Sequence, residues 1–263
     1  MTSLLNDEGA TNLKESHDLQ QGHFSDSLSI VTGNTVTIAT NYAEGGESFG
    51  QGYSGDPSSP TTADGLGGGA SFEGGTATFN GATINENVAQ GGPSPAGDAG
   101  SAYGGGLYAE GTPSSNTVLN VISSTVENNT AEGGVGMDDI NGNIGGGGNG
   151  GGICTSQASL HMQGSLVTTN IAQGGNVTAS GDSNAGGTGG GIDLNELGNS
   201  GVNTFHAPFT HSVITDSTIS YNQTKIGSDS RTTLVVEAAE GWPFCLQTQL
   251  SRKISSLIIQ PEG

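Results

Sequence analysis

The sequence predicts an all-β fold: a right-handed, single-stranded parallel β-helix of about 8–10 rungs with glycine-rich loops. Two interleaved repeats and an unusual composition lead to this prediction. Only 31% of the residues are hydrophobic and 5% are aromatic, while 48 are glycines, which argues against a conventional layered core. The ordered alternative is a repeat fold in which each unit buries a few aliphatic residues against its neighbours. The other alternative is a disordered glycine-rich linker.

The first repeat is an aliphatic residue, two variable residues and an asparagine, followed by alanine two positions later and then by two glycines. It occurs at residues 38–46, 84–92, 126–134 and 167–175, with a shorter copy at 219–222. Its asparagines are Asn41, Asn87, Asn129, Asn170 and Asn222, at spacings of 46, 42, 41 and 52 residues. At one corner of successive rungs, these side chains would form a ladder of amide hydrogen bonds. The alternative is that each asparagine only favours a turn.

The second repeat is a triple glycine followed by a small or aliphatic residue, at residues 67–70, 104–107, 150–153 and 189–192. Glycine permits a corner that has no room for a Cβ atom, although a flexible linker would also be glycine-rich. Glycine-rich stretches at 45–64, 91–102, 133–149 and 174–188 are expected to be loops on one side of the solenoid.

Short segments that alternate polar with apolar or β-branched residues predict the strands, at residues 35–38, 76–79, 118–121 and 214–219. The period is too short for a strand, a helix and a second strand with their loops. We interpret it as two rungs of roughly 20 residues each.

The charge is strongly one-sided, with 25 acidic and 5 basic residues and a net charge of −20. No lysine or arginine lies between Lys14 and Lys225. Repulsion therefore argues against nucleic acid and anionic membranes as partners, and no apolar run is long enough to span a membrane. A polysaccharide lyase that uses a basic side chain as its base is also excluded from this stretch.

The two repeats resemble the GGAI and FxxN repeats of polymorphic outer-membrane and autotransporter-like adhesins, and more widely the right-handed β-helix proteins with the pectate-lyase-like fold. The resemblance covers about residues 27–227. It implies a secreted stalk, adhesin or passenger without catalytic residues. Ile or Val replaces the aromatic residue of FxxN, which is a departure from the family pattern.

Three regions are expected: an irregular leader at 1–26, the β-helix at 27–227 and a different segment at 228–263. That last segment is nearly free of glycine and holds the only tryptophan, Trp242. It is either a cap over the last rung or a truncated or aberrant tail. We expect the chain to be part of a larger exported polypeptide, at the cell surface or outside the cell, with an extracellular protein or glycan as its partner.

We expect no catalysis and no cofactor. The alternative is a glycan-binding or glycan-hydrolysing β-helix that uses two carboxylates on stacked rungs, Asp193 with Asp216 or with Glu196. Loops with Asp138, Asp139 and Asp182 offer oxygen ligands for weak calcium binding, although they do not match a known calcium motif. The two cysteines, Cys154 and Cys245, have no metal-binding spacing.

Overall fold

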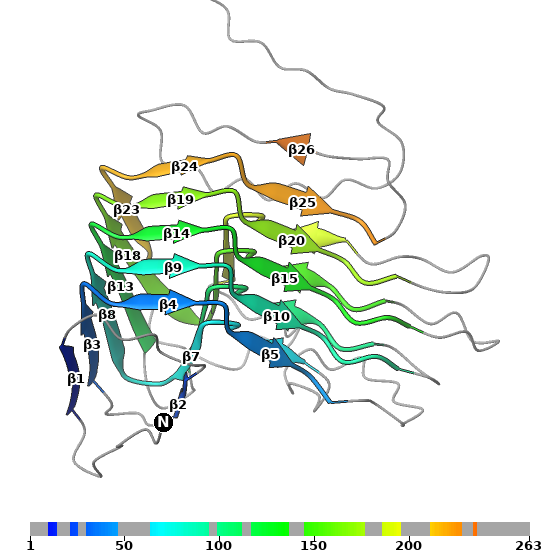
Figure 1. The fold of residues 1–263 in the computed structure, drawn as a ribbon, viewed down its shortest axis with the longest axis horizontal. Helices are drawn as coiled ribbons and strands as arrows, with labels where there is room; N and C mark the ends of the chain where they lie inside the picture. The colour runs from blue at the N-terminus through cyan, green and yellow to red at the C-terminus, as the bar shows by residue number, and fades with distance from the viewer. Residues whose placement is uncertain are drawn as a thin grey trace, which may run out of the picture.

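The computed structural model describes residues 10–14, 22–25, 30–46, 64–94, 99–111, 117–136, 145–176, 186–195, 211–227 and 234–235. Every element in these ranges is a β-strand, and the ranges contain no helix that could cross a membrane. The strands stack in parallel into five sheets, which confirms the predicted all-β parallel β-helix. The chain climbs from the blue strands to the orange ones in a right-handed sense (Figure 1).

Three sheets, A, B and C, enclose the body of the molecule. Sheet A contains β1 (Ala10–Lys14), β3 (Ile30–Asn34), β8 (Thr76–Asn80), β13 (Thr117–Ile122), β18 (Ala158–Gln163) and β23 (Val213–Thr215). Sheet B contains β4 (Thr37–Ala39), β9 (Thr83–Asn85), β14 (Thr125–Glu127), β19 (Leu166–Thr168) and β24 (Thr218–Ser220). Sheet C contains β2 (Gly22–Ser25), β7 (Ala70–Glu73), β12 (Leu107–Glu110), β17 (Ile153–Ser156) and β22 (Ile192–Asn195).

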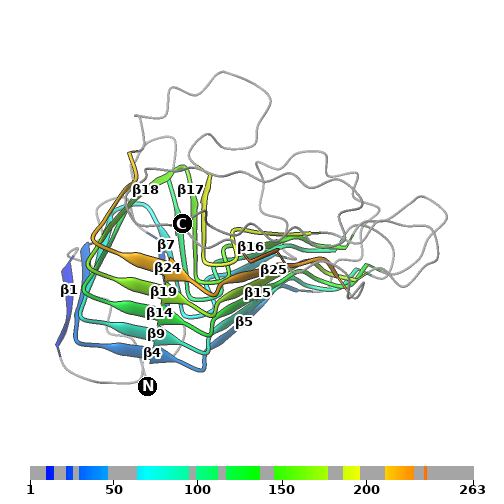
Figure 2. The ribbon, with the colours of Figure 1, turned by 90° about the horizontal axis from the view of Figure 1, so that it is seen from above.

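The other two sheets, D and E, run side by side out of the body as a flat extension, which we call the fin (Figure 2). Sheet D contains β5 (Tyr42–Glu44), β10 (Val88–Gln90), β15 (Thr130–Glu132), β20 (Ile171–Gln173), β25 (Gln223–Lys225) and the antiparallel β26 (Leu234–Val235). Sheet E contains β6 (Gly65–Leu66), β11 (Ala102–Tyr103), β16 (Gly148–Asn149) and β21 (Gly187–Thr188).

One turn of the chain, which we call a coil, passes through sheets E, C, A, B and D in that order. Strands β2–β5 form coil 1, β6–β10 coil 2, β11–β15 coil 3, β16–β20 coil 4 and β21–β25 coil 5. Each sequence repeat therefore makes a single coil, and the prediction of 8–10 rungs of about 20 residues is wrong. Equivalent residues of successive repeats pair directly, as Ile38 does with Ile84 and Ile84 with Val126. The fin accounts for the extra length of each coil.

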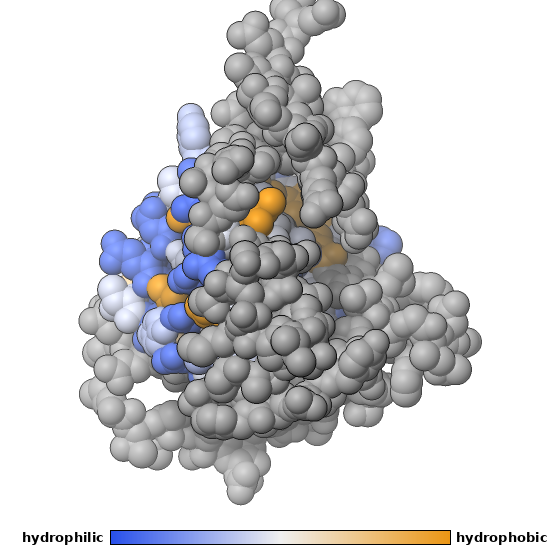
Figure 3. Space-filling model, turned by 90° about the vertical axis from the view of Figure 1, so that its right-hand side faces the viewer, coloured by the Kyte–Doolittle hydropathy of each residue, from blue (hydrophilic) through white to orange (hydrophobic). Residues whose placement is uncertain are grey.

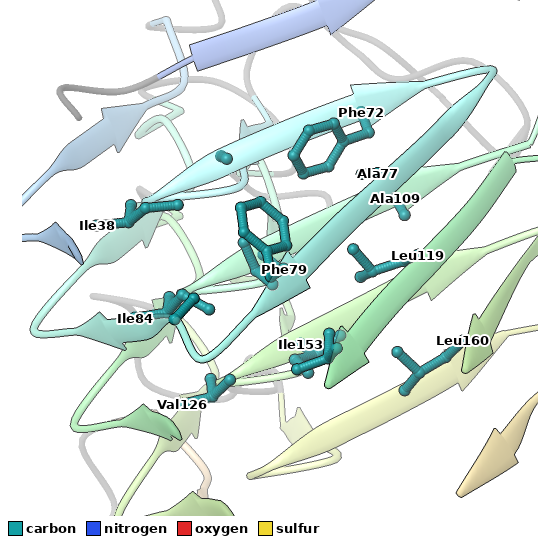
Figure 4. Packing of buried hydrophobic residues seen from close by; sticks show 14 of the residues in the cluster. Ile38, Phe72, Ala77, Phe79, Ile84, Ala109, Leu119, Val126, Ile153 and Leu160 are labelled. Atoms are coloured by element: carbon teal, nitrogen blue, oxygen red, sulfur yellow. The ribbon is translucent and has the colours of Figure 1, made fainter. Parts of the chain in front are cut away.

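Columns of inward-facing aliphatic residues fill the body. In sheet B the column consists of Ile38, Ile84, Val126 and Val167, all at most 1% exposed. The column meets residues from sheets A and C, including Phe72 and Phe79, whose rings pack edge to face with centroids 5.8 Å apart (Figure 4). Each side chain thus packs against its equivalents above and below and against the two facing sheets.

The interior of the fin is much thinner, because only alanine and glycine separate its two layers. Ala89, Ala102 and Ala131 form a small buried cluster apart from the main core. At Gly65, an added Cβ atom would lie 2.2 Å from the backbone oxygen of Gln90 in the facing layer. The backbones of sheets D and E are therefore in direct contact, which no larger residue would allow.

Glycine backbones also hydrogen-bond across the fin. Gly100 N donates to Gly92 O (3.0 Å), Gly134 N to Gly100 O (2.8 Å), Gly146 N to Gly134 O (3.0 Å) and Gly175 N to Gly146 O (2.7 Å). Each bond joins a residue that follows a sheet D strand to one that precedes a sheet E strand. This zigzag connects the layers of the fin as well as its coils, and it satisfies backbone groups that would otherwise need water.

Thr155 is the exception in the apolar core, because its buried hydroxyl oxygen makes no hydrogen bond. Its strand partners in sheet C are Ala109 and Leu194. An unsatisfied buried hydroxyl costs free energy. We expect Thr155→Val to raise the free energy of unfolding by about 1 kcal/mol, measured by urea denaturation. Thr155→Ser, which keeps the hydroxyl and loses the methyl group, should lower it, and a destabilised Thr155→Val would contradict this account.

Candidate functional site

The five repeat asparagines lie at one corner of the coil, between sheets B and D, and form a continuous ladder. The Nδ2 atoms of Asn41, Asn87 and Asn129 each lie 2.9 Å from the Oδ1 atom of the next asparagine. The corresponding distance from Asn170 to Asn222 is 3.0 Å. The structure thus has the asparagines in the stacked arrangement and not as isolated turn residues.

Each inner asparagine uses its full hydrogen-bonding capacity. The Asn129 amide donates to Asn170 Oδ1 and to the backbone oxygen of Ile84, both at 2.9 Å. Its Oδ1 atom accepts from the side chain and the backbone of Asn87, at 2.9 and 3.0 Å. Two donors and two acceptors are the whole capacity of an amide side chain, so this buried residue has no unmet polar group.

The third glycine of each triple-glycine repeat packs against this ladder. A Cβ atom at Gly106 would lie 3.1 Å from Asn129 Cγ, and one at Gly152 would lie 3.0 Å from Asn170 Cγ. Gly69 and Gly191 stand in the same relation to Asn87 and Asn222. The two sequence repeats therefore meet in space, where the body narrows into the fin.

A second ladder, which the sequence analysis missed, consists of serines at the corner between sheets A and B. The Ser165 hydroxyl accepts from the backbone N–H of Ser124 and the Ser217 hydroxyl from that of Ser165, both at 3.1 Å. The Ser124 hydroxyl accepts in the same way from Ala82 N at 3.0 Å. The available signal was a serine five positions before each of the last three ladder asparagines.

Stacking does not bring together the two carboxylates considered for glycan hydrolysis. Asp193 lies on β22 and Asp216 follows β23, so both belong to coil 5 and not to neighbouring coils. Asp193 stacks instead on Cys154, and its Oδ2 atom lies 2.6 Å from the Thr188 hydroxyl. Asp216 is exposed at the corner between sheets A and B. The third candidate, Glu196, lies outside the described residues.

Ionisable side chains do gather where sheet E turns into sheet C. The rings of Tyr103 and Tyr108 lie 5.8 Å apart, and Cys154 pairs with Tyr108 across the sheet. Burial, together with the Asp64 carboxylate, raises the pKa of Tyr103 to about 12. Burial also raises the pKa of the Cys154 thiol well above its usual value. The thiol is therefore protonated at neutral pH, and it lacks the thiolate form that reacts as a nucleophile.

A pair of glutamates also stacks in sheet C, where Glu73 pairs with Glu110 in the next coil. Partial burial raises the pKa of Glu110, and the neighbouring charge of Glu73 raises it further, while a hydrogen bond from Tyr108 opposes both effects. Like charges on directly paired residues destabilise a sheet. The Glu73–Glu110 pair therefore adds negative charge to sheet C without a basic side chain to balance it.

The calcium candidates Asp138, Asp139 and Asp182 lie outside the described residues. Within the described ranges, no group of three or more histidine, cysteine, aspartate or glutamate side chains is placed to hold a metal ion. Cys154 is buried and free, and Cys245 lies outside the described residues.

The connections between sheet D and sheet E differ in length from coil to coil, from 11 residues between β10 and β11 to 20 residues between β5 and β6. All four expected glycine-rich loops connect a sheet D strand to a sheet E strand, and residues 47–63, 95–98, 137–144 and 177–185 within them lie outside the described residues. The flanking residues stack regularly, as Gly136 N shows by donating to Asn176 O at 2.9 Å. In the view toward this edge, the described residues that can be seen include both hydrophilic and hydrophobic ones (Figure 3).

Searches against protein-family models, curated proteins and solved structures find no match to this chain. The likeness to surface adhesins accordingly depends on the two repeat motifs.

The ladder predicts a large loss of stability when one of its amides is removed. Asn129→Ala removes the acceptor of the Asn87 backbone N–H and side-chain amide and the donor to the Ile84 carbonyl, and it leaves Asn170 Oδ1 with one of its two donors, the backbone N–H of residue 129. We expect the free energy of unfolding to fall by about 1–3 kcal/mol in urea denaturation. Asn85→Ala is the matched control, because the Asn85 Oδ1 atom makes no hydrogen bond. Equal losses for the two variants would contradict a ladder that stabilises the fold.

Contact between the repeats predicts that the triple glycine tolerates no side chain. Gly106→Ala would place a Cβ atom 2.7 Å from Gly152 O as well as against Asn129. Since both neighbours are held in the stack, we expect a loss of about 1–3 kcal/mol, measured by the same denaturation. Gly186→Ala, where no atom of the described residues comes within 4 Å of the added Cβ, should be nearly neutral. A Gly106→Ala protein as stable as wild type would show that the ladder is not packed against this glycine.

Proposed function

We propose that this chain is a noncatalytic, adhesin-like segment of an exported surface protein. In it, a stiff β-helix presents the D-to-E connections along the edge of the fin to an extracellular protein or glycan. The observation that carries the proposal is the contrast between constant coils and variable connections. The D-to-E connections range from 11 residues (91–101) to 20 residues (45–64), yet the strands that flank them keep the same register.

Two further features support a scaffold over an enzyme. The Cys154 thiol is protonated, and Asp193 and Asp216 belong to one coil. The acidic surface suits a secreted protein that must stay soluble and avoid anionic polymers.

The test measures binding of the full chain to a glycan array and to immobilised extracellular-matrix proteins. In two variants, residues 137–144 or 177–185 are replaced by the four residues found at 95–98. We expect binding to a hit to weaken by roughly tenfold or more in at least one variant, because the connections supply the contacts. The far-ultraviolet circular dichroism spectrum and melting temperature should stay close to those of wild type.

The matched control replaces residues 112–116, which connect sheet C to sheet A, with an unrelated segment of equal length. This variant should bind as wild type does, since the segment connects two strands of the body, β12 and β13, and not the two sheets of the fin. Release of reducing sugars from any bound glycan would contradict a noncatalytic role. Unchanged binding by both fin variants would contradict presentation at the fin edge.

A further inference from the structure

Coil 5 ends the stack with open strand edges. Strands β21, β22, β23 and β24 are the last members of sheets E, C, A and B, so each has a described neighbour on one side only. The top of Figure 1 shows this last layer. Unpaired edges of this kind invite pairing with another segment.

The apolar interior is also incompletely covered at coil 5. Ile153 and Val167 in coil 4 are fully buried, whereas their partners in coil 5, Ile192 and Ile219, are only partly buried. Ile214 on β23 shows the same difference, because it is exposed while its partner in coil 4, Met162, is buried. Coil 5 therefore presents an apolar surface that a further layer would bury.

The asparagine ladder also indicates that a further layer can add to coil 5. Asn170 donates both its backbone N–H and its side-chain amide to Asn222 Oδ1, at 3.0 Å each. Asn222 itself donates to the Val167 carbonyl at 3.0 Å, and no described residue takes the place of a sixth asparagine. The Asn222 amide, at the end of the ladder, can therefore donate a hydrogen bond to one more segment.

The chain begins to supply such a segment itself. Strand β26 pairs with β25 on its open side, and it is antiparallel, with Thr224 opposite Leu234 and Gln223 opposite Val235. An antiparallel strand reverses the path of the chain and occupies the edge of sheet D. A second copy of the protein therefore cannot continue the parallel stack in register across this sheet.

We propose that residues 236–263 form the cap of the solenoid by docking on the open surface of coil 5. These residues lie outside the described ones. Their sequence suits the role, because Trp242, Phe244 and the run 257–259 supply apolar side chains and the segment is almost free of glycine. At about 3.3 Å per extended residue, the segment is more than long enough to follow β21–β24. This inference is independent of the proposed function.

The test uses the fluorescence of Trp242, the only tryptophan, which reports the environment of this segment alone. We expect a blue-shifted emission maximum in the native full-length chain, moving toward the denatured value in Ile214→Asn. Thr215→Asn is the matched control on the same strand, because alternate residues point to opposite faces. Its emission should match wild type. Native emission equal to that of the urea-denatured chain would overturn the proposal, as would equal emission of wild type and a folded Ile214→Asn.

A second measurement keeps the proposal testable if Ile214→Asn fails to fold. Hydrogen exchange followed by mass spectrometry compares the full chain with a chain ending at Val235, which retains β26. Without the cap, we expect amides of β22–β24 to exchange roughly tenfold faster, while those of coil 3 keep their rates. Unchanged exchange in β22–β24 would overturn the proposal. Protection of these amides that rises with protein concentration would also overturn it, by identifying a second copy as the occupant.

Discussion

The whole architecture depends on the hydrogen bonds that join each coil to the next in fixed register. A body of this composition has few large apolar residues, so uniform stacking must compensate for the lack of a thick apolar core. The asparagine ladder enforces that stacking, since an amide displaced by one residue would leave donors and acceptors buried without partners. The serine ladder applies the same constraint at a second corner, where the hydroxyls of Ser165 and Ser217 receive backbone N–H groups. Together the two rows hold both ends of sheet B in place.

Glycine has a different function in each half of the coil. Where the body narrows into the fin, Gly106 and its equivalents leave room for the ladder amides. In the fin, Gly100, Gly134 and Gly146 bring two backbones close enough to bond directly. These requirements explain why a chain so rich in glycine is ordered over its repeats: the residues that loosen an unfolded chain are those that permit close contact here. The alternative of a uniformly flexible linker does not account for this regular pattern of contacts.

Much of this fold could be predicted from the sequence, because the position of each asparagine recurs beside the same aliphatic and glycine residues. The number of residues in one coil could not be predicted in this way. A period fixes the distance between equivalent residues, and it fits two short rungs as well as one long coil with a fin. The fin itself was hidden because its interior contains alanine and glycine, such as Ala89 and Ala131, and gives no hydrophobic pattern. Asp193 and Asp216 were paired on the assumption of short rungs, and the longer coil separates them from that stacking geometry.

Each coil contacts only the coil before it and the coil after it along the stacking axis, and this arrangement has a mechanical consequence. The hydrogen bonds between strands of successive coils run along this axis. Tension along the axis therefore pulls directly on these bonds, and the interface between two coils can open one contact after another. Tension applied across a coil, from the fin toward the body, loads the covalent chain and shears many contacts at once. A molecule built this way is compliant in one direction and resistant in the other, and the orientation in which it is anchored decides which response an external pull meets.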